Sequence, residues 1–407
     1  MRSSAPPSRV PDVLIVGGGL VGCACAFHLA RAGVQVLLAE ASSLNAGASG
    51  QTAGSLHFQI ERRFLEDDGN GSGEIDRIVS LNRLAIEEWA GLENALSRDL
   101  DITMDGGLML AENEADLALL QQKSAREAAA GLATRLLDAG EARAMLPGLS
   151  PTVRGAAFQP HEGHANPRIL ADAYADAARQ LGATIRTGTR LDALSMTEAR
   201  QYRATLVGPA GVETLVVPQI FVAAGAWTAS IVGRLGLQLP LFPVPLSLNV
   251  TDKGGPELPY LVQHVGKRLS LKQSEAGNFL IGGGWASRFA FRADGSIDLD
   301  TPPLPVAESV SGNLQAAIDV MPALRHRSLV RSWTGITCIS ADQLPIAGML
   351  PAAPGLFVAA GGSMFTMGPV IARLLAAQIM GRAEEADPIA PFTPARFAHL
   401  NAFAVLP

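Results

Sequence analysis

The stretch Val13-Leu-Ile-Val-Gly-Gly-Gly-Leu-Val-Gly22, continuing to Glu40, decides the fold of this chain of 407 residues. Its first four residues form an apolar run that is typical of a strand buried on both faces. Glycines spaced as Gly17-x-Gly19-x-x-Gly22 follow, and they open a helical pattern over residues 23–32. A second apolar run over residues 34–39 ends at Glu40. The order strand, glycine turn, helix, strand and acid predicts a dinucleotide-binding unit.

Each glycine of this turn has its own physical role. Gly17 permits the tight turn, Gly19 lets a pyrophosphate approach the backbone, and Gly22 lets helix and strand pack closely. The N–H groups and the positive dipole end of the helix favour a phosphate. Glu40 is placed to accept hydrogen bonds from ribose hydroxyls, and its charge would repel a 2′-phosphate. The unit alone does not distinguish FAD from NAD as the bound dinucleotide. The alternative interpretation is a glycine-rich turn that binds no ligand.

Composition narrows the class of protein. The net charge is −6 and no basic run occurs, which argues against nucleic acid as a partner. Apolar residues make up 48% and charged residues 17%, as expected for a globular enzyme with a large core. The same bias is expected for a chain whose apolar surface is covered by a partner subunit. The length leaves room for two domains.

Cysteine usage and the apolar segments predict where in the cell the protein is located. Cys23, Cys25 and Cys338 form neither a disulfide framework nor a zinc-site spacing, so we expect a reducing, cytoplasmic location and no metal. Residues 1–11 lack an apolar segment and are expected to form a loose tail, not a signal peptide. Glycines and a histidine interrupt the apolar stretch 13–29, so we expect no transmembrane segment.

Beyond Glu40, periodicity and turn residues predict further helices and strands. A run of small residues, 46–55, would let the backbone pass close to a flat ligand. Helices are predicted at 76–100, 112–139, 168–181 and 304–321, and a last helix runs through Gln378 after the strand and glycine turn of 356–369. Strands are predicted at 107–111, 183–191, 204–206 and 219–227, and residues 240–252, 260–273 and 279–285 alternate like an antiparallel sheet. Residues 155–158 precede a predicted turn at 163–167. The expected class is α/β.

Several separated motifs together resemble the family of FAD-dependent amine oxidoreductases that includes D-amino acid oxidase, glycine oxidase and sarcosine oxidase. The motifs are the glycine turn with Glu40, residues 48–54, 163–167, 223–227, 333–335 with 342–348, and 361–369. This resemblance covers nearly the whole chain. It implies a Rossmann-like, glutathione-reductase-type FAD-binding domain assembled from residues 1–90, 151–228 and 331–407. An inserted antiparallel-sheet cap domain, residues 91–150 and 229–330, would bind the substrate.

The same resemblance implies hydride transfer from the carbon that bears the amine to flavin N5, followed by hydrolysis of the imine. The cysteine that holds flavin covalently in monomeric sarcosine oxidases would align with Gly335, so we expect non-covalent FAD, and Cys338 is interpreted as an ordinary buried thiol. The implied FAD contacts are Gly17, Gly19, Leu20, Val21, Gly22, Glu40, Ala41, Ala48, Ser49, Gly50, Ala53, Gly54, Ser55, Leu56, Leu191, Ala224, Gly225, Trp227, Gly335, Gly361, Gly362, Met364, Phe365, Thr366 and Met367.

Two positions depart from the family pattern. The arginine that clamps the substrate carboxylate in D-amino acid and glycine oxidases would fall near Thr337, which cannot form a bidentate pair. The oxygen-activating lysine of sarcosine oxidases would align near Leu280. This absence favours a dehydrogenase that passes electrons to another carrier, although glycine oxidases also lack that lysine. The remaining candidates for the carboxylate, each with a solvated surface charge as the alternative, are Arg62, Arg63, Lys272, Arg288, Arg292 and Arg331.

His57 and Lys272 are the candidate catalytic residues. His57 follows the flavin loop and could accept a proton or bind the substrate. Lys272 could balance negative charge on the reduced flavin or on the substrate. A structural role is the alternative for both. His161 and His164 lack the carboxylate-rich context of a metal site.

Residues 54–59 and 362–369 look most like the catalytic β subunits of heteromeric amino-acid dehydrogenases, such as opine oxidases and hydroxyproline dehydrogenases. The resemblance implies an opine-like, N-substituted or cyclic amino acid as substrate. Partner subunits with further redox cofactors would reoxidise the flavin. Three alternatives stay open: a stand-alone glycine, sarcosine or D-amino acid oxidase that uses O2, a non-catalytic flavoprotein subunit, and an NAD-dependent dehydrogenase.

Overall fold

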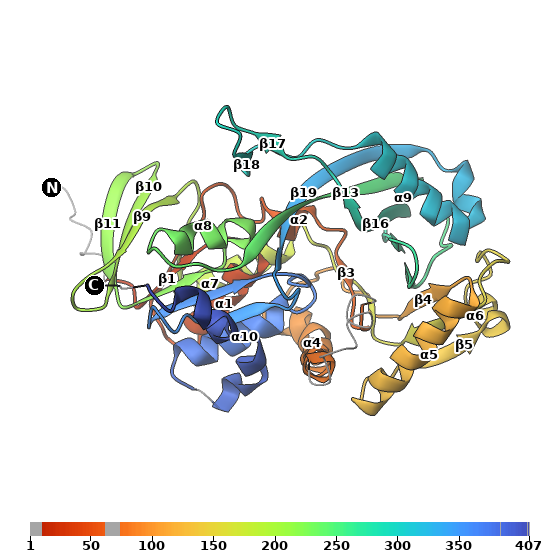
Figure 1. Ribbon diagram of the computed structural model, residues 1–407, viewed down its shortest axis with the longest axis horizontal. Helices are drawn as coiled ribbons and strands as arrows, with labels where there is room; N and C mark the ends of the chain where they lie inside the picture. Colours follow the sequence, from red (N-terminus) through yellow and green to blue (C-terminus); the bar gives the residue numbers. More distant parts are fainter. Residues whose placement is uncertain (1–9, 62–73, 383, 405, 407) are drawn as a thin grey trace.

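A six-stranded sheet forms the centre of one half of the molecule (Figure 1). The computed structural model describes residues 10–61, 74–382, 384–404 and 406, so most of the expected N-terminal tail lies outside it. Neighbouring strands are parallel, except that β20 and β21 are antiparallel. The predicted α/β class and Rossmann-like unit are therefore confirmed. The strand order is β20 (Ile346–Met349), β21 (Leu356–Ala360), β12 (Gln219–Val222), β1 (Val13–Val16), β2 (Val36–Ala39) and β8 (Thr184–Arg186).

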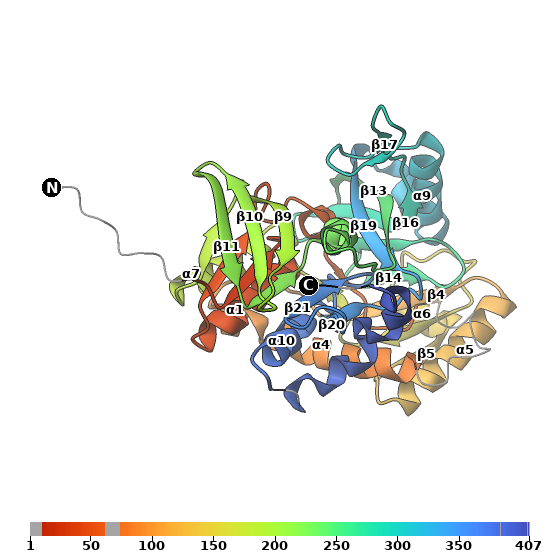
Figure 2. The same cartoon turned by 60° about the vertical axis from the view of Figure 1, so that its left-hand side comes forward.

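Successive residues of β1 point to opposite faces of this sheet, and each face has its own core. Val13 and Ile15 belong to a cluster with residues of α1 (Leu20–Arg31), α7 (Leu170–Gln180) and α10 (Gly368–Ile379). Leu14 and Val16 belong to a second cluster with an antiparallel sheet of β9 (Arg190–Met196), β10 (Tyr202–Gly208) and β11 (Gly211–Val217). Figure 2 shows this smaller sheet on the side away from α10. The apolar run of β1 is thus buried on both faces, as predicted.

The β9–β11 sheet is only partly predicted by the sequence. The expected strands at 183–191 and 204–206 are in fact the short β8 followed by three strands that reach Val217. Alternate residues of β11 are exposed, and Val212 is 72% exposed. Because apolar residues occupy both faces of β11, it lacks a clean period of two.

The helix predicted over residues 112–139 is wrong in its second half. α5 (Glu114–Ala129) ends early, and the chain continues as β5 (Arg135–Asp138) and α6 (Ala139–Met145). Gly131 has a φ of +84°, a left-handed conformation that commonly follows a helix end. Asp138 then caps α6, because its side chain accepts a hydrogen bond from the N–H of Glu141 at 2.8 Å. The alanine-rich composition of this region hides the break.

The other half of the molecule is built on an eight-stranded sheet. Neighbouring strands are antiparallel except β14 and β4, so the predicted antiparallel sheet is present with one parallel pair. α9 (Ala307–Val320) packs on β13 and β16, on the far side of the molecule from β9–β11 (Figure 1). The order is β19 (Leu329–Ser340), β13 (Leu241–Lys253), β16 (Asn278–Ala286), β15 (Ser270–Gln273), β14 (Leu261–His264), β4 (Gly107–Ala111), β6 (Gly155–Gln159) and β5.

Two strands of this sheet come from segments that the resemblance assigns to the FAD-binding domain. β6 pairs with β4 and β5, and β19 pairs with β13. This pairing places residues 155–159 and 329–340 in the eight-stranded sheet. The division of the chain into domains stays a prediction. Within the described ranges, no helix is both long and apolar enough to cross a membrane.

Candidate active site

The glycine turn lies at the carboxyl end of β1, and its geometry requires glycine. Gly17 has a φ of +113°, and a Cβ there would lie 2.5 Å from the backbone oxygen of Ala223. A Cβ on Gly22 would lie 2.0 Å from the oxygen of Gly17. Gly19 begins α1 without a side-chain cap, and the N–H of Leu20 donates to Ser49 Oγ at 3.1 Å. The start of α1 therefore presents backbone to a ligand with no side chain of Gly19 in the way.

Glu40 lies beside this turn at the end of β2. Its Oε2 accepts a hydrogen bond from the N–H of Gly18 at 2.7 Å, and its Oε1 accepts one from the N–H of Ser42 at 2.8 Å. These bonds hold the carboxylate next to the start of α1. Each carboxylate oxygen can accept a second hydrogen bond, so the group is still able to receive ribose hydroxyls.

The end of β12 lies against the same turn. The N–H of Ala223 donates to the oxygen of Val16 at 2.9 Å. A short 3-10 helix, η1 (Gly225–Trp227), follows, with Gly225 at a φ of +52°. The predicted contacts Ala224, Gly225 and Trp227 are thus at the carboxyl end of a strand next to β1, where ligands bind in such sheets.

Two predicted FAD contacts lie in other surroundings. Leu191 is buried on β9, within the core between the two sheets. Ala41 is exposed just after β2. Their contacts with FAD stay predictions.

The small-residue run expected to pass a flat ligand forms a short helix and a turn. α2 (Ala48–Gln51) precedes Gly54, which has a φ of +79° and whose Cβ would lie 2.2 Å from the oxygen of Ala165. The indole Nε1 of Trp333 donates to the oxygen of Gln51 at 2.8 Å. A Cβ on Gly335 would lie 2.6 Å from Gln51 Oε1. Motifs from three distant parts of the sequence therefore meet here.

The segment after β3 (Ser55–Leu56) lies against the glycine-rich loop that precedes α10. The N–H of His57 donates to Thr366 Oγ1 at 3.2 Å. Trp89, on α4 (Glu74–Leu96), donates from its indole to the oxygen of Thr366 at 2.7 Å, and its ring lies 5.7 Å from that of Phe365. The hydroxyl of Ser363 donates to Glu61 Oε1 at 2.9 Å. These bonds bring the two predicted flavin loops, residues 55–57 and 361–367, side by side.

His57 has an imidazole suited to proton transfer. Its Nε2 lies 3.3 Å from Ser270 Oγ, which is 3.5 Å from Ser55 Oγ. Its Nδ1 is buried and has no hydrogen-bond partner among the described residues. Burial lowers the pKa of His57 below the usual 6.5, so the ring is neutral at neutral pH. A neutral imidazole with an unused nitrogen can accept a proton.

Lys272 faces the same side of β15 as Ser270, because alternate residues of a strand share a face. The side chain is buried, with 4% of its surface exposed, and its ammonium makes no hydrogen bond or ion pair with any described residue. Burial lowers the pKa of Lys272 to about 7. Burial, with a smaller contribution from the charge of Lys272, lowers the pKa of His164 on β7 (Gly163–His164) to about 3.

The structure thus brings the two predicted catalytic residues together with Ser270 and His164, which the sequence reasoning missed. From the sequence, His164 is considered only as a possible metal ligand. In the described part of the chain no group of acidic, histidine and cysteine side chains is arranged to hold a metal ion. The position of Ser270, two residues before Lys272 on one strand, is the signal that could have identified it.

Lys272 stands apart from the other candidates for the substrate carboxylate. Arg288 and Arg331 are exposed, and Arg292 is paired with Asp298 and Asp300 at 3.2 and 3.0 Å. Arg62 and Arg63 lie outside the described residues. Of the four described candidates, Lys272 is therefore the one that is buried and without a counter-charge.

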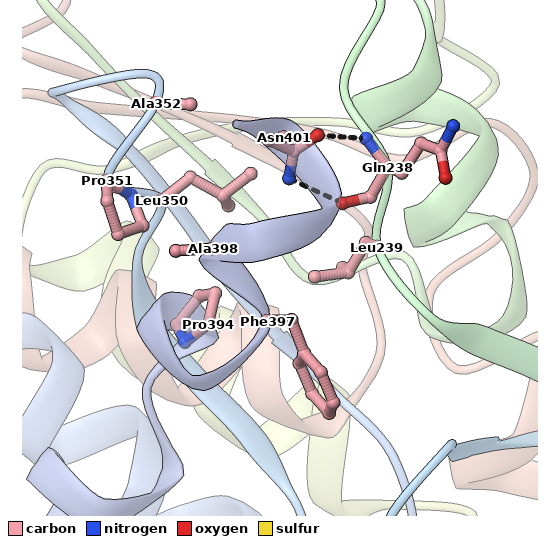
Figure 3. A pocket seen from close by; sticks show the side chains of 9 residues that line it. All are labelled: Gln238, Leu239, Leu350, Pro351, Ala352, Pro394, Phe397, Ala398 and Asn401. Carbon is pink, nitrogen blue, oxygen red and sulfur yellow. Dashed lines mark hydrogen bonds between the residues drawn. The ribbon is translucent and has the colours of Figure 1, made fainter. Parts of the chain in front are cut away.

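A cavity near the C-terminus is lined by none of the candidate catalytic or carboxylate-binding residues. It lies between the loop after β20 and the 3-10 helix η4 (Pro394–Asn401), and Figure 3 shows Asn401 bonded directly to Gln238 at its edge. Asn401 accepts from the N–H of Gln238 at 2.7 Å and donates to its oxygen at 2.9 Å. The volume, about 30 Å³, suits one or two water molecules and no substrate. These bonds attach the C-terminal segment to the core.

The sequence matches the family described as FAD dependent oxidoreductase (DAO) over residues 12–378. The chain belongs to this family. Glycine oxidase of Geobacillus kaustophilus is 29% identical over 95% of this chain and 97% of that protein, and its crystal structure matches with a TM-score of 0.79 over 95% and 98% of the two chains. A subunit of the opine oxidase of Rhizobium meliloti is 27% identical over 95% and 97%. Iminodiacetate oxidase of Chelativorans sp. BNC1 is 25% identical, with a TM-score of 0.76 over 94% and 98%.

FAD is accordingly the cofactor of this family member, and the chain's own residues fit it. The glycine turn and the start of α1 suit the pyrophosphate, and Glu40 suits the ribose of the adenosine. The loops at 48–54 and 361–367 supply small residues and backbone around the segment that carries His57.

Proposed function

We propose that this FAD-dependent oxidoreductase oxidises the carbon–nitrogen bond of an amino acid or of a secondary amine acid such as an opine. One observation carries this proposal: a buried cation without a counter-charge, Lys272, and a neutral base, His57, both lie near Ser270. A buried ammonium without a counter-charge favours an anionic ligand, and a substrate carboxylate supplies one. A neutral base beside it suits a substrate that carries an ammonium group.

Each residue then has one task. Lys272 binds the carboxylate and so fixes the orientation of the amine carbon. His57 accepts a proton from the substrate ammonium through its imidazole and leaves the amine neutral, the form from which a hydride can depart. FAD, when bound, would supply the acceptor for that hydride, and water would hydrolyse the imine product. Ser270 holds Nε2 of His57 and keeps the ring in place during the proton transfer.

Non-covalent binding of FAD is part of the proposal. Gly335 stands where the resemblance places a flavin-bearing cysteine, and a Cβ there would lie 2.6 Å from Gln51 Oε1, so a side chain at this position would have to displace that of Gln51. Cys338 is buried, with 4% of its surface exposed, and burial raises the pKa of its thiol. A buried, protonated thiol is a poor nucleophile.

We further propose that the chain acts as the catalytic subunit of a heteromeric dehydrogenase, with partner subunits that reoxidise the flavin. Similarity to a subunit of opine oxidase over nearly the full length supports this. A stand-alone oxidase is the second candidate, and one observation favours it. Lys272 is paired in register with Leu280 of β16, so a lysine lies one strand away from the position where sarcosine oxidases carry theirs.

Two measurements test the proposal. Under anaerobic conditions octopine, nopaline, sarcosine, D-proline and hydroxyproline are titrated separately into the purified yellow protein, and one of them should bleach its flavin. A protein that none of them bleaches would support an unlisted amine or a non-catalytic subunit. Steady turnover of the chain alone with dissolved oxygen, with stoichiometric peroxide, would overturn the need for partner subunits.

A further inference from the structure

Two buried carboxylates hold the backbone directly after His57. Glu162, in the turn between β6 and β7, accepts hydrogen bonds on Oε1 from the N–H groups of Phe58 and Gln59, at 2.9 and 3.0 Å. Glu127 of α5 accepts one from the N–H of Ile60. Three consecutive peptide groups are therefore bound by carboxylates in place of a β-ladder.

The carboxylates are parts of one buried network. Lys123 Nζ donates to Glu127 Oε2 at 2.8 Å and to Gln59 Oε1 at 2.7 Å. The amide of Gln59 donates in turn to Glu162 Oε2 at 2.8 Å. The side chains of Lys123, Glu127 and Glu162 are fully buried. The network thus joins α5 and the β6–β7 turn to the segment that carries His57.

Such a network is costly if stability is its only effect. Burying two carboxylates and one ammonium removes their hydration, and apolar residues of similar volume are often equally or more stabilising. What the network does provide is direction, since each acceptor fixes one peptide plane. His57 is fixed on its other side by its own N–H bond to Thr366, so its backbone has little freedom.

We propose that Glu162 and the Lys123–Glu127 pair are positioning residues for His57, which hold its imidazole in reach of Ser270 and of the substrate amine. This inference rests on the proposed proton transfer by His57. The charge of Glu162 also acts on the ring itself: burial lowers the pKa of His57, and Glu162 and then Glu61 oppose that shift, while Lys272 of β15 adds to it. Removing the charge of Glu162 should therefore lower the pKa of His57 further.

The test compares flavin reduction in Glu162→Gln, His57→Gln and the double variant, each with bound FAD and with the substrate that bleaches the wild type. We expect Glu162→Gln to retain FAD and to slow reduction about tenfold or more, and its rate to reach half its plateau at a lower pH than in the wild type. On the His57→Gln background the same substitution should have almost no further effect, because both act through one group.

Glu112→Gln is the matched control. Glu112 accepts hydrogen bonds from Lys267 and Thr152 in a cluster near α5 that does not include the His57 segment, so this variant should change the unfolding temperature and not the pH profile. If Glu162→Gln does not fold, Lys123→Met combined with Glu127→Gln replaces it, because the pair removes the bonds that Lys123 donates to Gln59 and Glu127 without leaving a buried charge unpaired. That pair should likewise slow reduction only when His57 is present.

The outcomes separate the two proposals. If His57→Gln reduces its flavin at the wild-type rate, the proposed role of His57 is wrong. If His57→Gln is slow but the network variants are not, or if they slow reduction equally in the absence of His57, the positioning inference is overturned.

Discussion

His57 and Ser270, which are 213 residues apart in the sequence, meet with 3.3 Å between Nε2 and Oγ. The first lies after β3, against the loop that precedes α10, and the second lies on β15 of the eight-stranded sheet. The contact therefore joins the segment beside the loop that precedes α10 to the eight-stranded sheet, which is expected to cover the substrate. A proton acceptor placed there depends on both halves being in position.

Ser270→Ala tests this contact. The substitution removes the hydroxyl that holds Nε2, and we expect flavin reduction to slow by about threefold to tenfold, the range for one hydrogen bond, with little change in FAD content. Ser274→Ala is the control, since Ser274 accepts a bond from the N–H of Asn278 in the turn after the same strand. Equal effects of the two variants would assign Ser270 to strand stability alone.

Lys272→Met tests the carboxylate site. A charge-assisted bond of this kind contributes about 1.5–3 kcal/mol, so the affinity for a carboxylate substrate should fall roughly tenfold to a hundredfold. In the wild type the pKa of Lys272, about 7, predicts that affinity declines as the pH rises above 7, because the ammonium loses its proton. The variant should show no such decline. Anaerobic titrations between pH 6 and about pH 9 measure both effects.

The same lysine should reduce stability. Burial lowers the pKa of Lys272 from 10.5 in the unfolded chain to about 7 in the folded chain, so between these values the unfolded chain binds more protons and stability rises with pH. The destabilisation is complete below pH 7 and disappears as the pH approaches 10.5. Lys272→Met should therefore raise the unfolding temperature most at low pH. A variant less stable than the wild type at pH 6 would contradict the unpaired burial of Lys272.

Glu40→Ala tests the ribose site. Loss of a charged acceptor should weaken FAD binding by about tenfold or more. Glu213→Ala removes a half-buried carboxylate of β11 that pairs with Arg186, and it should leave the affinity unchanged. The visible spectrum of protein dialysed against decreasing FAD gives the comparison.

Non-covalent FAD has a simple consequence. Acid precipitation of the wild-type protein should leave all of the flavin in the supernatant. Yellow colour that stays with the pellet would show a covalent bond and would contradict the interpretation of Gly335.

The dinucleotide unit was predictable because all of its signals are local. Gly17, Gly22 and Glu40 lie within one strand–helix–strand unit, and steric limits at the turn dictate the glycines. The break after α5 could not be predicted from the sequence, because Gly131 lies in an alanine-rich region whose composition favours a helix throughout. The sequence predicts His57 and Lys272 as candidate catalytic residues, each for its own reason.

Their neighbourhood could not be derived from the sequence. It depends on the pairing of β15 in the larger sheet and on the position of that sheet over the loops of the smaller one. Glu162 carries no motif in the sequence. Its role depends on burial and on two peptide N–H groups about a hundred residues away, which only the folded chain shows.

The most direct test of the account is anaerobic reduction of the bound flavin by an amino acid substrate and by the matched amine without its carboxylate, in the wild type and in Lys272→Met. The account predicts that the amino acid bleaches the wild-type flavin far faster than the matched amine, and that this preference largely disappears in the variant. Equal reduction of the wild type by both compounds, or an unchanged preference in the variant, would contradict an amino acid oxidised while Lys272 holds its carboxylate.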